Sequence, residues 1–136
     1  MNPGHETLAR EFFNRLDTQG DLFALFTDDV EMTFPKWGTA RGKQQAGELL
    51  QGIGAYIRVI RHDPASFSVS CDGDRVIVEG LSSGQLADGS TWQPDGRCGG
   101  RFCTSFRLRD GYICRVAVYL DPDYADRTAG SYPWRR

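Results

Sequence analysis

Two residues, Asp121 and His62, combine a reactive side chain with a suggestive place in the sequence. Asp121 lies in "DGYICRVAVYLDPD" (residues 110–123), after an apolar run and directly before a proline. The "DG" predicts a hairpin turn and the apolar run predicts a strand, and neither requires a carboxylate at position 121. A carboxylate at the mouth of an apolar cavity loses hydration and holds a proton more readily, which suits acid/base catalysis. We therefore predict that Asp121 is a proton-transfer residue; the alternative is the solvated end of a strand.

His62 is the second candidate for proton transfer. It stands in "VIRHDP" (residues 59–64), where the chain passes from a predicted helix into the strands that follow. An imidazole exchanges protons near neutral pH, so His62 is expected to act as the polar partner of Asp121 or to orient a substrate. The alternative is a loop histidine that forms local hydrogen bonds beside Asp63.

Flat and branched apolar side chains are expected to form the substrate pocket. Aromatic rings supply apolar walls with polar edges, which suits a polycyclic or aromatic molecule, although core packing explains many such positions equally well. The six expected lining residues are Trp37, Tyr56, Trp92, Tyr119, Phe34 and Val118.

Metal and disulfide chemistry have little support in the sequence. The four cysteines are separated by 27, 5 and 11 positions, which leaves no C-x-x-C pair, and both histidines are distant from them. We expect reduced thiols that pack as small apolar side chains, and no zinc site. Asp121 and Asp123 without a neighbouring histidine are weak metal ligands. No cofactor is expected.

Composition indicates an ordinary globular protein. The 136 residues suffice for one domain, assigned to residues 1–136 with a C-terminal tail at 127–136. The net charge is −2 and the sequence has no long run of charges of one sign, so it gives no indication of binding to nucleic acid or to an anionic membrane. No run of 18 apolar residues and no basic-then-apolar leader is seen, so a cytoplasmic location is expected.

Helical spacing comes first in the chain and strand alternation follows. Apolar residues recur with helical spacing over 7–16 and 43–60, and a short helix capped by Asp21 is predicted at 22–27. The segment 29–34 alternates as a strand, and 35–42 is predicted to be a loop. After His62, strands are predicted at 66–71, 75–86, 101–109 and 110–120. The class is α+β, with helices on one face of a curved antiparallel sheet and a cavity between the layers.

Strand parity leaves the orientation of Asp121 open. Strict alternation places Val116, Val118 and Leu120 on the face that forms the pocket wall, and Tyr119 and Asp121 on the opposite face. A bulge or twist at the strand end would be needed to bring the Asp121 carboxylate into the pocket.

Two segments, residues 12–45 ("FFNRLDTQGDLFALFTDDVEMTFPKWGTARGKQQ") and residues 106–122 ("FRLRDGYICRVAVYLDP"), carry a family resemblance. Their order resembles the nuclear transport factor 2-like superfamily, and within it the SnoaL-like polyketide cyclases, over about Leu8 to Asp126. The resemblance implies a cone-shaped domain with a mostly apolar pocket, usually as a homodimer; the three N-terminal helices are those predicted from the spacing above. It also implies that Asp121 matches the acid/base carboxylate of those cyclases.

Two related activities fit this sequence less well. Limonene epoxide hydrolases add an Arg and an Asp two residues apart on the middle strand, where this chain reads "EGLS" at 79–82. Ketosteroid isomerases place their base just before the proline that ends the first strand, and this chain has Phe34 there.

Two classes of function follow. One is a cofactor-free cyclase, isomerase or dehydratase acting on a small apolar, polyketide-like molecule. The other is a non-catalytic ligand-binding or accessory dimerisation protein. Two or more titratable groups within hydrogen-bond reach in the pocket would favour the enzyme. In the tail, Tyr132 and Trp134 are expected to fold back on the domain or on its dimer mate.

Overall fold

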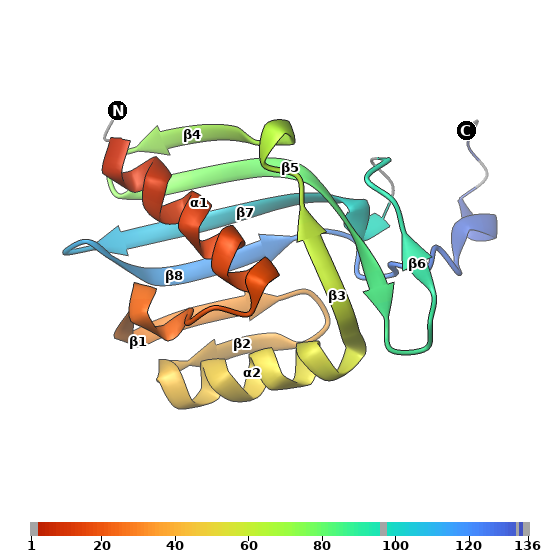
Figure 1. Cartoon of the computed structure of the whole chain (residues 1–136), viewed down its shortest axis with the longest axis horizontal. Helices are drawn as coiled ribbons and strands as arrows, with labels where there is room; N and C mark the ends of the chain where they lie inside the picture. The colour runs from red at the N-terminus through yellow and green to blue at the C-terminus, as the bar shows by residue number, and fades with distance from the viewer. Residues whose placement is uncertain (1–2, 96–97, 133, 135–136) are drawn as a thin grey trace.

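The computed structural model describes residues 3–95, 98–132 and 134. Two α-helices, α1 (Pro3–Thr18) and α2 (Gly42–Tyr56), pack against a strongly curved sheet (Figure 1). The described residues form these strands: β1 (Phe26–Phe34), β2 (Gly38–Arg41), β3 (Ile57–His62), β4 (Ser68–Asp72), β5 (Arg75–Leu86), β6 (Thr91–Trp92), β7 (Arg101–Arg109) and β8 (Tyr112–Tyr119). Short 3₁₀ turns lie at η1 (Phe23–Leu25), η2 (Pro64–Ser66), η3 (Cys98–Gly100) and η4 (Ala129–Ser131).

The strands follow the order β2-β1-β8-β7-β5-β3, with β4 and β6 also paired to β5. The long strand β5 pairs with β4 through its first half and with β3 and β6 through its second half, so it bends across the domain. Gly84 permits this bend, because a Cβ there would lie 2.2 Å from the carbonyl oxygen of Val59 and 2.4 Å from the Trp92 ring.

The predicted antiparallel sheet is mixed. Among the strands that the structure describes, β1 and β8 run parallel and the other pairs are antiparallel. A parallel neighbour requires a long crossover in the chain, and the segment from β1 to β8 contains α2 and most of the sheet. Alternation of apolar and polar residues identifies each strand, but it does not indicate that β1 and β8 are neighbours in the sheet.

The prediction of three N-terminal helices is also wrong, since the described part of the chain forms two α-helices, α1 and α2. The second predicted helix is the single 3₁₀ turn η1, although Asp21 does cap it, with Oδ1 accepting from the backbone N–H groups of Phe23 and Ala24 at 3.0 and 3.3 Å. The third ends at Tyr56, and residues 57–62 form β3 instead. The segment "IRVIRH" is rich in β-branched residues, which favour a strand where a partner such as β5 is available. The predicted loop at 35–42 contains β2.

The late strands match their prediction. β5 and β7 have the predicted bounds, and Asp110 and Gly111 form the two-residue turn of the β7–β8 hairpin. Both turn residues have positive φ, 54° and 83°, as a type I′ turn requires.

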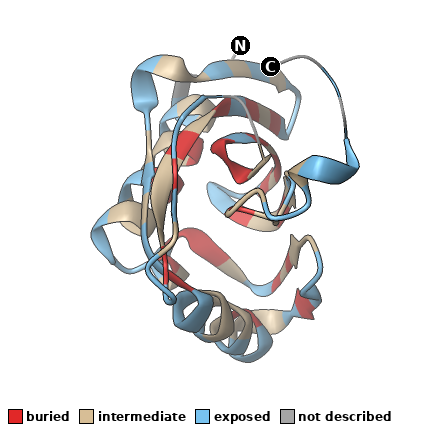
Figure 2. Ribbon diagram, turned by 90° about the vertical axis from the view of Figure 1, so that its right-hand side faces the viewer, coloured by how far each residue is buried: buried red, intermediate tan, exposed pale blue. Residues whose placement is uncertain are grey.

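The main core lies between α1 and the concave face of the sheet. It joins Ala9, Phe12 and Phe13 of α1 to strand residues such as Phe106 and Val116. Figure 2 shows the buried segments around the interior of the domain and exposed ones on the outer sides of the helices. The four cysteines are free in the structure. Within the described ranges, no helix is long and apolar enough to cross a membrane.

Candidate functional site

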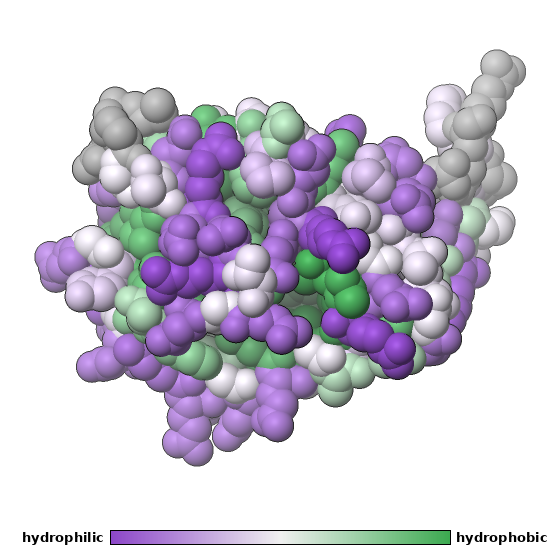
Figure 3. All heavy atoms as spheres, viewed as in Figure 1, coloured by the Kyte–Doolittle hydropathy of each residue, from purple (hydrophilic) through white to green (hydrophobic). Residues whose placement is uncertain are grey.

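A cavity of about 630 Å³ lies between the two helices and the concave face of the sheet. Its walls are mostly apolar, and Figure 3 shows the green hollow that it forms among hydrophilic surface residues. As strand parity predicted, Val116, Val118 and Leu120 line it. The size is in the usual range for sites that bind small organic molecules.

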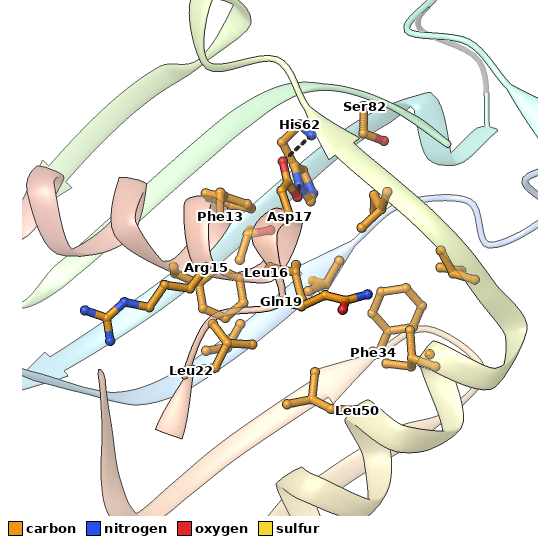
Figure 4. A pocket seen from close by; sticks show the side chains of 18 of the residues that line it. Phe13, Arg15, Leu16, Asp17, Gln19, Leu22, Phe34, Leu50, His62 and Ser82 are labelled. Carbon is orange, nitrogen blue, oxygen red and sulfur yellow. Dashed lines mark hydrogen bonds and ion pairs between the residues drawn. The ribbon is translucent and has the colours of Figure 1, made fainter. Parts of the chain in front are cut away.

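One polar pair, Asp17 and His62, stands on this apolar wall (Figure 4). Asp17 Oδ1 lies 2.6 Å from His62 Nδ1, and Asp17 Oδ2 accepts the backbone N–H of His62 at 2.7 Å. The exposed fractions of the two side chains are 19% for Asp17 and 7% for His62. Both carboxylate oxygens therefore hold the same histidine.

This contact selects the tautomer of the imidazole. A carboxylate oxygen only accepts hydrogen bonds, so the proton between the two side chains lies on Nδ1. In the neutral ring Nε2 is then the unprotonated nitrogen. Among the described residues, no hydrogen bond to Nε2 is found, although the ring lines the cavity. Nε2 can accept a proton from a molecule bound there.

Aromatic rings surround the imidazole. The rings of Phe13 and Phe102 lie 4.8 and 5.0 Å from it, centroid to centroid. Such packing restricts rotation of the ring and excludes water from it. The pair thus has the parts of a general base, an oriented imidazole and a carboxylate that can stabilise its protonated form.

The two residues come from elements that are distant in sequence. Asp17 lies in the last turn of α1, on the stripe that also carries Ala9 and Phe13 at spacings of four. His62 is the last residue of β3, where it pairs with Ser82 of β5. His62 was predicted as a site residue from the sequence, whereas Asp17 was not, because the predicted helix ended at residue 16. The sequence did contain one indication of its role, because an acidic residue at position 17 shares a helical face with the apolar residues Ala9 and Phe13. Asp63 instead caps η2 through the backbone N–H of Ala65.

The prediction that Asp121 points into the cavity is wrong. Its side chain is exposed, does not line the cavity, and accepts the backbone N–H of Asp123 at 2.9 Å. This is an Asx turn around Pro122, a common arrangement where a strand ends. Strand β8 has no register shift near its C-terminal end, so no bulge turns the chain toward the cavity before the strand ends at Tyr119.

The six predicted lining residues divide into two groups. Phe34 and Val118 line the cavity. The other four, Trp37, Tyr56, Trp92 and Tyr119, do not.

Each of these four aromatic residues has a different position. Trp37 packs against Gly52 of α2 and is 43% exposed, and Tyr56 is 40% exposed at the end of that helix. Trp92 is buried behind the wall, where its Nε1 donates to Ser82 Oγ at 3.1 Å. Tyr119 is 58% exposed on the convex face of the sheet.

The segment after β8 supplies a lining residue that the sequence analysis missed. Tyr124 is 2% exposed and lines the cavity. The beginning of the predicted tail is attached to the domain, because Arg127 forms an ion pair with Asp88. Tyr132 and Trp134 are 68% and 82% exposed, so the prediction that they fold back on their own domain is wrong. Residues 133, 135 and 136 lie outside the described ranges.

Cys98 lies beside this segment but is unsuited to nucleophilic chemistry. Burial, together with the hydrogen bond from Sγ to Asp126, raises the pKa of the thiol to about 12. The reactive form of a cysteine is the thiolate. Within the described ranges, no group of three or more His, Cys, Asp or Glu side chains could hold a metal ion.

We expect iodoacetamide at pH 8 to alkylate Cys98 at least about 10²-fold more slowly than a free cysteine, because so little thiolate is present. Peptide mass spectrometry of time points, with the chain denatured in urea as the control, measures this rate. Equal rates in the native and denatured chain would contradict the prediction.

The fold is therefore a curved sheet that encloses an apolar cavity with a polar pair on its wall. The model of the SnoaL-like domain family matches residues 8–116, and the chain belongs to this family, within the NTF2-like superfamily. No functionally curated protein shows significant similarity to the chain.

Solved structures share the fold at low sequence identity. A protein assigned as a SnoaL-like polyketide cyclase from Jannaschia sp. CCS1 is 17% identical, with 98% of each chain covered and a TM-score of 0.76. An NTF2-like protein of unknown function from Burkholderia pseudomallei is 18% identical, with 93% of this chain and 97% of that one covered and a TM-score of 0.75. TerC, co-crystallized with polyporic acid, is 19% identical, with coverage of 87% and 92% and a TM-score of 0.72. At these identities the likeness establishes the fold alone.

Proposed function

We propose that the protein catalyses a cofactor-free proton transfer on a small, mostly apolar organic molecule, with His62 as the base. The observation that carries this proposal is the Asp17–His62 hydrogen bond of 2.6 Å on the wall of an apolar cavity. A protein that only binds an apolar ligand does not need an oriented, water-shielded imidazole.

In the proposed reaction, Nε2 of His62 takes a proton from an activated carbon of the substrate. The electron pair of the broken C–H bond stays on the substrate, and the positive charge on the imidazolium faces the Asp17 carboxylate. The Nε2–H group then returns the proton. Return to another carbon gives isomerisation, return to a departing hydroxyl gives dehydration, and return after carbon–carbon bond formation completes a cyclisation. A positioned base of this kind contributes about 10²–10⁴-fold to the rate.

Proteins of the same fold support this class of function. One neighbour is assigned as a polyketide cyclase, another was crystallized with polyporic acid, and a third is a Mycobacterium tuberculosis epoxide hydrolase of the LEH-like type. One fold hosts many chemistries, so these neighbours favour a small-molecule enzyme without specifying its reaction. The free cysteines agree with a cytoplasmic enzyme.

Hydrogen exchange tests the proposal. The probe is 1-tetralone, a bicyclic ketone whose α-hydrogens exchange with D₂O after proton abstraction, and ¹H NMR follows the exchange. We expect the protein to accelerate the exchange above the rate in buffer. Binding of the ketone without acceleration would favour the non-catalytic ligand-binding function instead.

The convex face of the sheet supports a second part of the proposal, a homodimer. Both helices pack on the concave side, which leaves Tyr119 58% exposed and the β5 side chain of Ile77 only half-buried on the other side. A second hollow of about 510 Å³ lies on this face, bordered by Glu79, Arg101 and Tyr119. A second copy of the chain would cover these side chains.

We expect sedimentation equilibrium at micromolar concentration to give twice the mass of the chain. Tyr119→Arg places a charge in the proposed interface and should weaken dimerisation about tenfold or more, since exposed aromatics are common anchors of interfaces. Tyr112→Arg, at the exposed hairpin end, is the matched control. A monomeric wild-type protein would contradict the dimer.

A further inference from the structure

The cavity has a cationic side chain that the proposed reaction does not use. Besides His62, the charged residues of the described chain that line it are Arg15, Asp17, Asp21 and Arg58. Arg15 is paired with Glu11 at 2.8 Å, and Asp17 holds His62. The Asp21 carboxylate is occupied as the cap of η1.

Arg58 differs from these residues because no ion pair with a carboxylate is found for it within the described ranges. Its guanidinium donates to the carbonyl oxygen of Ala87 at 3.3 Å, which holds the side chain at the rim of the cavity. A guanidinium carries five N–H donors, so most of them remain available to a ligand.

Arg58 stands at an irregular point of β3. The register of β3 against β5 shifts between Ile57 and Val59, so Arg58 is an extra residue in this strand. Such a bulge changes the direction of the side chains around it. Ile57 is buried and Arg58 is exposed beside it, and both residues line the cavity.

A second polar side chain, that of Gln19, borders the cavity at the end of α1. Its φ is 58°, a left-handed conformation in which the residue after a helix is most often glycine. The turn is closed by the backbone N–H of Gly20, which donates to the carbonyl oxygen of Arg15 at 2.7 Å. Figure 4 shows the Gln19 side chain extending from α1 toward Phe34. No hydrogen bond of its amide is found within the described ranges, so a bound molecule can be its partner.

The charges of the cavity are separated along β3. Arg58 and His62 are four residues apart, which places their Cα atoms about 13 Å from each other in an extended strand. Ile60 lies between them and adds to the apolar lining. The Asp17 carboxylate lies at the His62 end, where it repels a second negative charge, whereas the guanidinium attracts one. An apolar ring body with one anionic group fits this arrangement, with the ring toward His62 and the anion at Arg58.

We propose that Arg58, assisted by Gln19, binds a carboxylate of the substrate at the rim of the cavity, so that the substrate class is a ring-containing carboxylic acid. This inference rests on the proposed function for the bound molecule being a substrate whose reacting carbon lies at His62. The planar guanidinium can present two parallel N–H donors to the two oxygens of a carboxylate, and the amide NH₂ of Gln19 can add a third. The carboxylate keeps its charge throughout, so Arg58 orients the substrate and takes no part in proton transfer.

The test compares 2-naphthoate with 2-naphthamide, which share their ring system and shape and differ in charge. Ligand-observed NMR at low ionic strength measures both dissociation constants. Wild-type protein should bind the carboxylate about 3- to 10-fold more tightly than the amide. Arg58→Gln should remove most of this preference and leave the binding of the amide unchanged.

Arg61→Gln is the matched control. It removes the same charge from the same strand, but Arg61 is exposed and does not line the cavity. The preference for the carboxylate should therefore remain in this variant.

Four results would overturn the proposal. The first is no preference of the wild type for the carboxylate, including no binding of either ligand. The second is a preference that Arg58→Gln leaves intact. The third is the same loss in Arg61→Gln as in Arg58→Gln, which indicates general attraction to a positive surface. The fourth is an equal loss for both ligands in Arg58→Gln, which indicates a packing role.

The hydrogen-exchange assay with 1-tetralone separates this inference from the proposed function. If Arg58 confers the preference for the carboxylate but the protein does not accelerate exchange, the anion contact stands and the proposed function fails. If the protein accelerates exchange but shows no preference, the proposed function stands and Arg58 has no role in recognition.

Discussion

Replacing His62 by asparagine is expected to slow proton transfer by about 10²–10⁴-fold. The amide nitrogen of asparagine occupies nearly the place of Nδ1, so it can still donate to Asp17 and preserve the contact that joins α1 to β3. What the substitution removes is Nε2, the atom that faces the ligand. Binding of 1-tetralone should therefore change little while exchange of its α-hydrogens approaches the rate in buffer.

Asp121→Asn is the matched control for this experiment. Asp121 is the other residue that the sequence suggests as a base, but its side chain is exposed and outside the cavity. We expect the wild-type rate of exchange from this variant. A large loss in Asp121→Asn with little effect in His62→Asn would reverse the assignment of the base and support the role suggested by the family resemblance.

Asp17→Asn is expected to produce a loss of similar size, about 10²–10⁴-fold, without removing the base. The carboxylate accepts from both the backbone N–H and Nδ1 of His62, whereas an amide has one acceptor oxygen and one donor NH₂. One contact must therefore be lost, or Nδ1 must become the acceptor and shift the proton to Nε2. An imidazole protonated at Nε2 has no free electron pair toward the cavity, and the same loss of orientation and tautomer is very damaging in Ser-His-Asp triads.

Nitrogen-15 NMR of labelled histidine separates this positioning role from simple destabilisation. The wild type should show the Nδ1–H tautomer of His62, and Asp17→Asn should shift the ring toward the Nε2–H form. The variant should also lose about 1–3 kcal/mol of unfolding free energy, because a buried hydrogen bond is mispaired. Unchanged tautomer and exchange rate with only a lower melting temperature would make Asp17 a structural residue.

Strand geometry on the C-terminal side was predictable from residues that are close in the chain. The "DG" at Asp110–Gly111 has the conformational freedom that a type I′ turn needs, and it forms that turn. Alternation through Val116 and Val118 identified the cavity face of β8, because successive side chains of a strand point to opposite faces. The same alternation placed Asp121 correctly on the outside, where the resemblance to the cyclases suggested the reverse.

The identity of β3 and the pairing of β1 with β8 depend on tertiary contacts, which cannot be predicted from the pattern within one segment. Residues 57–60 have apolar spacing compatible with a helix, yet they form part of β3 because β5 offers a pairing partner. The parallel pairing of β1 with β8 joins segments at opposite ends of the chain. Neither outcome is visible in the periodicity of one segment.

The proposed site also combines a feature that the sequence predicts with features that only the tertiary structure determines. The identity and setting of His62 in the sequence were enough to select it as a candidate, since few residue types exchange protons near neutral pH. Its partner Asp17 is 45 positions away and stands on another element, so nothing in the local sequence pairs the two. Packing of α1 across the concave face brings the carboxylate to the end of β3, and that packing selects the tautomer, the buried setting and the direction of Nε2.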